Sequence, residues 1–274
     1  MYSTKVLYHG PQCPDGWAAA YCAWTVLGDE GVEYIPVQYQ EPPPAIAQDD
    51  HIYIVDFSYP REVLLEMKAV ASEVIVLDHH KTAMEQLLGL DFAVFDMNRS
   101  GAMLAWEYWH PNETAPELIH YVQDRDLWKH QLPHTEEIYM ALREYPRDFI
   151  VWHLLATMPN FVEELAAEGK PLLAAKKQEV EAHAAQYHLE IIGGYQIPVV
   201  EAYRYYSDIA NFLCHCHPEA PFAACYRFTQ GKKKYDLRSL EFDVSAIARL
   251  YGGGGHHKAA GFTVNADSNL THLN

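Results

Sequence analysis

Histidine and aspartate residues recur directly after short, apolar, β-rich segments in the first half of the sequence. Charged groups in such positions are costly to bury unless they pair with a partner or bind a metal ion. Imidazole and carboxylate groups together are typical ligands of first-row divalent metals. The pattern therefore indicates a metal site, and the positions concerned are His9, Asp56 and the run Asp78-His79-His80.

The surrounding elements predict how these residues come together. β-rich segments alternate with helical ones, which is typical of an α/β fold with a mostly parallel sheet and helices on both faces. In an open parallel sheet, ligands bind at the carboxyl ends of the strands, so we expect all three positions to face one crevice. The predicted strands are residues 5–8, 32–37, 51–55, 74–77 and 92–95, and the predicted helices are 15–27, 60–71 and 101–109.

Further candidate ligands flank this set. Cys13 and Asp15 lie just beyond the first strand, and Asp124-Arg125-Asp126 follows a helical segment over 117–122. Taken alone, an aspartate after a strand is more often a helix cap than a ligand, and a His-His pair is ordinary. Their joint occurrence at one sheet edge favours metal binding. Five or six such ligands can hold two ions about 3.5–4 Å apart, an arrangement suited to in-line phosphoryl displacement.

Several motifs resemble those of the DHH phosphoesterases, in the same order along nearly the whole chain. Residues 76–82 resemble the signature that names the family, and residues 9–16 resemble its first motif, His-x-x-x-Asp-x-Asp. Residues 55–58 resemble the second motif, and Asp124 falls where the fourth is expected. Residues 252–262 are similar to the DHH-associated C-terminal domain, whose glycine loop holds substrate phosphate. The family's first-motif aspartate is replaced by a cysteine in this sequence.

The resemblance implies a set of roles. Asp56 would bridge two ions, with Mn²⁺ expected and Mg²⁺ or Co²⁺ as alternatives. Asp78 would orient the neighbouring histidine and His80 would contact the phosphate, so both are assigned to catalysis. The remaining metal ligands would be His9 and Cys13 for the first ion, and Asp15, His79 and Asp124 for the second, with Asp126 as the alternative to Asp124.

Cys13 leaves two interpretations open. As a thiolate it would ligate the first ion and favour softer metals such as Co²⁺ or Zn²⁺. As a neutral thiol it would leave that ion more weakly held. We favour the neutral thiol, because a single thiolate among hard ligands suits Mn²⁺ poorly.

A run of four glycines in the second half predicts an anion site. Glycines allow backbone N–H groups to approach a phosphate without obstruction by side chains. A flexible turn is the alternative explanation for the run, and an ordinary surface arginine is the alternative for each arginine. The candidate substrate-binding residues are Arg99, Arg238, Gly253, Gly254, Gly255, His256 and His257.

The predicted organisation has four parts. Residues 1–158 form a catalytic metal-binding domain, and residues 159–194 a helical connector interrupted around 169–171. Residues 195–267 form a smaller α/β domain that binds substrate, and residues 268–274 a tail. Cys214-His215-Cys216-His217 with Cys225 matches no common zinc spacing and predicts buried thiols with exposed histidines.

Composition limits the partners. Lys and Arg total 20 and Asp and Glu total 37, which gives the 274-residue chain a net charge of −17. Such a surface disfavours long nucleic acids but admits a short anion. No signal peptide or membrane span is expected, and five sparse cysteines predict reduced thiols and a cytoplasmic location.

The leading functional hypothesis is a phosphodiesterase that cleaves very short oligonucleotides, such as dinucleotides or linear diguanylate, to mononucleotides. The first alternative is a manganese-dependent pyrophosphatase or polyphosphatase with the same metal ligands. The second is a nucleotide-binding regulator without turnover, for which Cys13 is the one reason in the sequence. Oligomeric state is left open.

Overall fold

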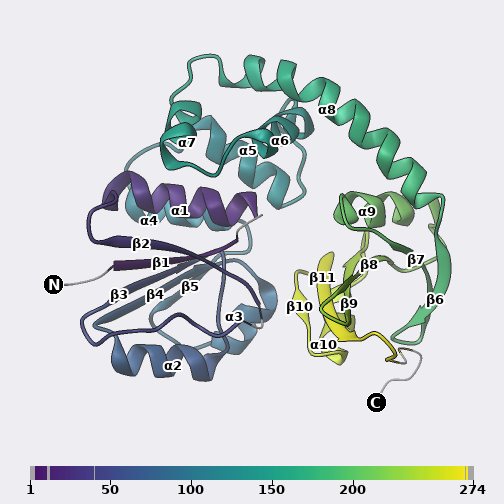
Figure 1. Cartoon of the computed structure of the whole chain (residues 1–274), viewed down its shortest axis with the longest axis horizontal. Coiled ribbons are helices and arrows are strands. Elements are labelled where there is room, and N and C mark those ends of the chain that lie inside the picture. Colours follow the sequence, from purple (N-terminus) through teal and green to yellow (C-terminus); the bar gives the residue numbers. More distant parts are fainter. Residues whose placement is uncertain (1–3, 11–12, 40, 269, 271–274) are drawn as a thin grey trace. The chain divides into compact units, whose positions relative to one another are not determined.

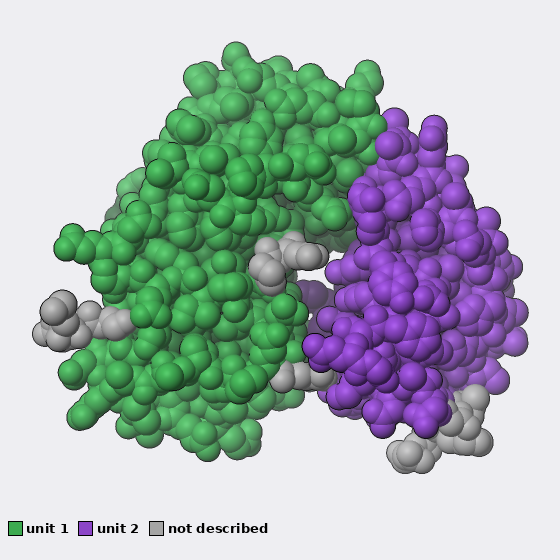
Figure 2. Space-filling view, in the orientation of Figure 1, with its two compact units in different colours: residues 1–173 green, residues 174–274 purple. Residues whose placement is uncertain are grey.

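The computed structural model describes residues 4–10, 13–39, 41–268 and 270 (Figure 1). The chain divides into two compact units, Met1–Leu173 and Ala174–Asn274 (Figure 2). Each unit contains its own sheet and hydrophobic core. Among the described residues, no helix is long and apolar enough to cross a membrane.

The first unit is built on a parallel sheet, which confirms the predicted α/β class. The strand order is β2-β1-β3-β4-β5, so successive connections leave β1 toward opposite edges of the sheet. The carboxyl ends of β1 and β3 mark this switch point, which is where open α/β sheets bind ligands. All neighbouring strands run parallel. The strands are β1 (Thr4–His9), β2 (Val32–Val37), β3 (His51–Val55), β4 (Glu73–Asp78) and β5 (Ala93–Phe95).

Helices cover both faces of this sheet (Figure 1). α1 (Pro14–Leu27) and α4 (Gly101–Trp109) pack on one face, against side chains such as Val6 of β1. α2 (Arg61–Val70) and α3 (Lys81–Leu87) pack on the other face, where the next residue, Leu7, is also fully buried. Successive side chains of a strand point to opposite faces, so both faces of the strands must be apolar.

A group of helices completes the first unit. α5 (Glu117–Asp126), α6 (Thr135–Glu144) and α7 (Phe149–Ala156) contribute buried side chains to the core that α1 and α4 share. α8 (Phe161–Ala184) follows as one continuous helix, so the predicted interruption at 169–171 is absent. A side chain at Gly169 would place its Cβ 1.7 Å from the carbonyl oxygen of Glu137. The glycine is therefore explained by close packing against α6 and not by a break in the helix.

The second unit contains a mixed sheet of order β10-β11-β9-β8-β7-β6. α9 (Tyr206–Cys216) covers one face and α10 (Val244–Leu250) the other. β6 forms within the segment predicted as a helical connector, because it pairs antiparallel with β7. The strands are β6 (His188–Ile192), β7 (Tyr195–Glu201), β8 (Ala223–Thr229), β9 (Lys232–Arg238), β10 (Gly254–Gly255) and β11 (Ala259–Asn265).

The predicted tail, 268–274, lies outside the described residues except for Ser268 and Leu270. Leu270 is 4% exposed and joins the core between the sheet and α10. Its carbonyl oxygen accepts hydrogen bonds from the backbone of Gly193 and from the hydroxyl of Tyr251. This position is therefore a packed part of the second unit.

Candidate metal centre

Asp56 lies at the centre of the predicted cluster. It directly follows β3, is 1% exposed, and has a φ angle of 54°, which is unusual for a residue other than glycine. Its backbone N–H donates to the carbonyl oxygen of Leu77, which fixes the turn after the strand. A left-handed backbone at a non-glycine residue persists only where surrounding contacts impose it, and such residues are concentrated at functional sites.

Both carboxylate oxygens of Asp56 face other candidate ligands. Oδ2 lies 3.4 Å from Nδ1 of His9, and Oδ1 lies 3.1 Å from Nε2 of His79. The thiol of Cys13 donates to Oδ2 over 3.3 Å. Three segments that are far apart in sequence thus meet at one carboxylate, as the strand-end pattern predicts.

Asp15 joins the cluster through the start of α4. It is 1% exposed, and its carboxylate accepts from the backbone N–H of Gly101 over 2.6 Å and of Ala102 over 3.0 Å. Backbone N–H groups at a helix N-terminus stabilise a carboxylate, which accounts for its burial. Oδ2 also lies 3.6 Å from Nε2 of His79. A Cβ at Gly101 would come within 2.3 Å of the Cβ of Asp56, so only glycine fits.

Asp126, and not Asp124, lies beside this group. Oδ2 of Asp126 is 3.5 Å from Nε2 of His79. Asp124 instead organises the loop after α5: it accepts from the backbone N–H groups of Gln131 and Leu132 and from the hydroxyl of Thr135. Residues two apart on a helix point to nearly opposite sides, so both aspartates cannot face the same site. The structure therefore places Asp126, the alternative for the fourth motif, beside His79 and places Asp124 in the loop after α5.

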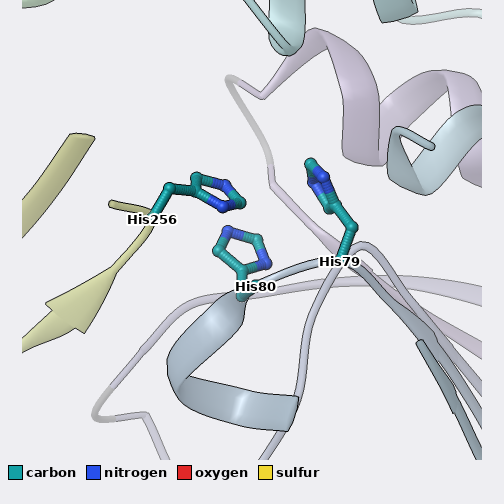
Figure 3. A group of neighbouring side chains, drawn as sticks. All are labelled: His79, His80 and His256. Atoms are coloured by element: carbon teal, nitrogen blue, oxygen red, sulfur yellow. The ribbon is translucent and has the colours of Figure 1, made fainter. Parts of the chain in front are cut away.

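Asp78 is hydrogen-bonded to the two residues that follow it, His79 and His80, whose rings are drawn in Figure 3. Oδ1 of Asp78 accepts from the backbone N–H groups of His79 and His80 and lies 2.6 Å from Nδ1 of His80. Oδ2 accepts from the hydroxyl of Ser58 over 2.5 Å. Asp78 is fully buried, and its contact with Nδ1 fixes the orientation of the His80 ring.

Among the described residues of the first unit, two three-residue groups have the donor set of a metal site, with ligand atoms that lie within 4.8 Å of one another. They share Asp56. Imidazole nitrogens with carboxylate oxygens suit Mn²⁺ and similar first-row ions. The first group contains His80 and not Cys13, which the family resemblance implies as a ligand of the first ion. The groups are His9, Asp56 and His80, and Asp15, Asp56 and His79.

The electrostatics also fit a cation. Burial, together with the charges of Asp56 and Asp126, raises the pKa of Asp15 well above its usual range. Burial raises the pKa of Asp56 too, but hydrogen bonds with His79 and His9 outweigh it and hold that pKa well below its usual value. Burial alone would lower the pKa of His79, but the hydrogen bond to Asp56 and nearby carboxylates raise it to about 10. Carboxylates crowded in this way favour a bound divalent ion, which would neutralise them.

Cys13 is the N-cap residue directly before α1. Its sulfur accepts from the backbone N–H of Gly16 over 3.5 Å and its thiol faces Asp56. Burial and the charge of Asp56 raise the pKa of the thiol well above its usual value. Cys13 therefore has a structural contact, the cap of α1, in addition to its place beside the cluster.

The glycine run of the second unit is partly a strand. Gly254 and Gly255 form β10, which pairs with Gly261 and Ala260 of β11. A Cβ at Gly253 would lie 2.1 Å from the carbonyl oxygen of Gly261. Close approach of the two strands therefore accounts for Gly253 without reference to a ligand.

Arg238 lies next to the turn that follows this run. It pairs in register with Ala259, and Ser239 donates to the carbonyl oxygen of Lys258. The Arg238 guanidinium donates to the hydroxyl of Ser207 over 2.5 Å and to the carbonyl oxygen of Leu237 over 2.8 Å. The structure thus brings Arg238 close to the turn that holds His256 and His257, as the sequence suggests for a shared anion site.

Arg99 has a different partner. Its Nε donates to Glu107 of the following helix, α4, over 2.8 Å, and the side chain is 41% exposed. Cys214 and Cys225 are buried thiols and His215 is exposed, as predicted, but Cys216 is exposed and His217 is half-buried. Within the part of the chain that the structure describes, these residues belong to no group with metal-ligand geometry.

Two residues beside the centre escaped sequence reasoning. Tyr39, in the loop after β2, places its ring centroid 5.5 Å from that of His9. Arg147, between α6 and α7, lies 5.1 Å from the ring of Trp152, and its buried Nη1 has no hydrogen-bond partner among the described residues. Both lie outside the recognisable motifs.

Sequence comparisons identify two relatives. No family model matches the chain. An uncharacterized protein of Acanthamoeba polyphaga mimivirus is 30% identical over 286 residues, which cover 93% of this chain and 66% of that protein. Oligoribonuclease NrnB of Bacillus subtilis is 25% identical over 243 residues, which cover 79% of this chain and 60% of that protein. The chain thus spans less than two thirds of the length of either relative.

Solved structures share the fold. The DHH domain of a member of the s1p family of ribosomal proteins matches 95% of this chain and 82% of its own, with a TM-score of 0.56 and 14% identity. RecJ of Thermus thermophilus in complex with Mn²⁺ matches 96% of this chain and 49% of its own, with a TM-score of 0.51 and 17% identity. These likenesses show that the chain shares the fold of DHH-domain proteins, and the Asp78-His79-His80 run resembles the signature of the DHH phosphoesterases.

Proposed function

We propose that this protein is a metal-dependent phosphodiesterase that hydrolyses very short oligonucleotides to mononucleotides. The observation that carries the proposal is the pair of ligand groups that share Asp56 at the carboxyl edge of the first sheet. A shared carboxylate between two sets of imidazole and carboxylate donors is the arrangement that a two-ion phosphoryl-transfer site requires. The likeness to an oligoribonuclease supports a nucleotide substrate.

The residues of the first unit would hold and orient the reacting groups. Two divalent ions, when bound, supply an activated water and neutralise the charge that develops on the phosphate. Asp56 would hold both ions, with His9 and His80 on one side and Asp15, His79 and Asp126 on the other. Asp78 would keep His80 in place through its short contact with Nδ1, so that Nε2 is the ring nitrogen left to face the ion. Mn²⁺ is the proposed metal, as in the related RecJ structure.

The second unit would bind a phosphate of the substrate. Arg238 and the turn after β10 combine a guanidinium with backbone N–H groups and histidines, all of which recognise phosphate oxygens. A net charge of −17 opposes binding of a long polyanion but has little effect on a substrate with few phosphates. We therefore propose dinucleotides, including linear diguanylate, as substrates.

The decisive experiment gives the purified protein Mn²⁺ with a dinucleotide or with inorganic pyrophosphate, and measures mononucleotide and orthophosphate release. We expect mononucleotide from the dinucleotide. Orthophosphate from pyrophosphate with no cleavage of the dinucleotide would identify a pyrophosphatase instead, and tight dinucleotide binding without cleavage would identify a regulator.

A pair of variants ties the activity to the metal centre. Asp56→Ala should abolish turnover while the protein stays folded, because the variant lacks the shared ligand of both ions. Asp49→Ala, at an exposed position, is the matched control and should behave like the parent. Activity of Asp56→Ala within tenfold of the parent at saturating Mn²⁺ would overturn the assignment.

A further inference from the structure

Tyr39 is an exposed aromatic side chain at the rim of the metal centre. It is 48% exposed, although large aromatic side chains are usually buried. Its ring centroid lies 5.5 Å from that of His9 and 6.0 Å from that of His80, and both contacts are edge-on. An exposed ring thus packs directly against two of the side chains that would surround the scissile phosphate.

The ring is held firmly from beneath. Its centroid lies 4.7 Å from that of Phe57, which is 1% exposed and packs edge-on against Tyr59 at 4.9 Å. Phe57 directly follows Asp56, so the support for the ring and the shared metal ligand belong to the same turn. Among the described residues, nothing accepts from or donates to the Tyr39 hydroxyl. The contacts that the structure describes for Tyr39 are therefore ring packing.

We propose that the exposed part of the Tyr39 ring stacks on a nucleobase of the substrate next to the scissile phosphate. Only a ribose separates a base from its phosphate, so a base can reach a ring that borders the phosphate site. Aromatic side chains stack on every base, because each base offers a π-face. This inference rests on the proposed nucleotide substrate, since inorganic phosphates have no group that stacks. It means that a residue of the first unit helps the protein to distinguish nucleotides from inorganic phosphates.

Three variants separate stacking from other roles. Tyr39→Leu keeps an apolar side chain but lacks the ring, and Tyr39→Phe keeps the ring but lacks the hydroxyl. Tyr108→Leu is the matched control. Tyr108 is 41% exposed and packs against another ring, as Tyr39 does, but it lies about two turns along α4 from the end of the helix that contacts the metal centre. Each variant is assayed with Mn²⁺ on a normal dinucleotide and on an abasic dinucleotide with the same sugar–phosphate backbone. Affinity for a non-hydrolysable methylenephosphonate dinucleotide is measured by calorimetry.

Stacking predicts a specific pattern. Tyr39→Leu should raise KM for the normal dinucleotide and weaken binding of the analogue about 5- to 150-fold, the range of a single base–aromatic stack. Its kinetics on the abasic dinucleotide should match those of the parent. Tyr39→Phe and Tyr108→Leu should stay within about threefold of the parent on both substrates.

Other results would overturn the inference in distinguishable ways. An equal loss on both substrates in Tyr39→Leu would mean that the ring only positions His9 or His80. A loss in Tyr39→Phe as large as in Tyr39→Leu would assign the role to the hydroxyl. An unchanged Tyr39→Leu would mean that no base contacts the ring. If the parent itself cleaves neither dinucleotide, the proposed function fails first.

Discussion

Substitution of Gly101 by alanine should disable the metal centre through a single methyl group. The new Cβ would lie 2.3 Å from the Cβ and 2.8 Å from the Cα of Asp56. Carbon atoms in contact are ordinarily about 3.5–4.0 Å apart, so α4 and the turn after β3 must separate by at least about 1.2 Å. The backbone N–H of Gly101 also donates to Asp15. The same displacement would therefore move two of the proposed ligands relative to each other.

The expected magnitude follows from that displacement. A misplacement of about 1 Å at reacting groups costs on the order of 100-fold in rate. Overpacking of a tight site costs about 1–3 kcal/mol of stability, and the higher helix propensity of alanine offsets up to about 1 kcal/mol of this. We therefore expect kcat/KM for a dinucleotide to fall about 100-fold, with only a modest decrease in Tm and a weaker response to Mn²⁺.

Gly28→Ala provides the matched control. Gly28 ends α1 with a φ angle of 67°, and no atom lies within 4 Å of the position that its Cβ would take. Alanine in that backbone conformation costs about 1–2 kcal/mol without contact with the centre. This variant should lose stability and keep its activity. If Gly101→Ala cleaves the dinucleotide within threefold of the parent at saturating Mn²⁺, the packing of α4 against Asp56 does not set the geometry of the site.

Three further predictions concern other residues. Asp126→Asn should lower activity and Mn²⁺ affinity at least tenfold with a nearly unchanged Tm. Asp124→Ala should instead lower Tm by several degrees, because it removes the acceptor of three hydrogen bonds. A thermal shift assay and an Mn²⁺ titration measure both effects, and the reverse pattern would identify Asp124 as the ligand. Cys13→Asp should keep or improve turnover at low Mn²⁺ and Cys13→Ser should change little, but joint loss of bound metal and activity in Cys13→Ser would identify the sulfur as a ligand. Arg238→Ala and His256→Ala should raise KM for a dinucleotide at least tenfold and leave a minimal aryl phosphodiester within about threefold, and equal losses on both substrates would contradict a role in binding the distant phosphate.

Much of the first unit could be predicted from the sequence because its signals are local. Alternation of strands and helices gave the parallel sheet, and the position of Asp56 and His79 directly after strands gave the edge where they meet. The choice between Asp124 and Asp126 could not be made, since it depends on which side of α5 faces the sheet. That orientation is set by packing between helices and by the loop that Asp124 organises.

Tertiary contacts also explain the other differences. The segment around Gly169 resembles a helix break, yet the glycine serves a close contact with α6 that joins residues far apart in sequence. Tyr39 follows a strand in a loop of ordinary composition, and its importance depends on rings contributed by His9 and Phe57. Neither contact leaves a periodic pattern that could be recognised in advance.

The pairing of β10 with β11 changes how the evolutionary record of this region should be interpreted. A side chain at position 253 would collide with the carbonyl oxygen of Gly261, whatever the protein binds. A glycine retained at position 253 among relatives would therefore record selection for sheet geometry, even in proteins that have lost the substrate. Arg238 is under no such steric constraint, because among the described residues its guanidinium donates to a hydroxyl and a carbonyl oxygen, neither of which requires an arginine for packing. Loss of Arg238 in a lineage that keeps Gly253 would mark a change of ligand with the fold intact.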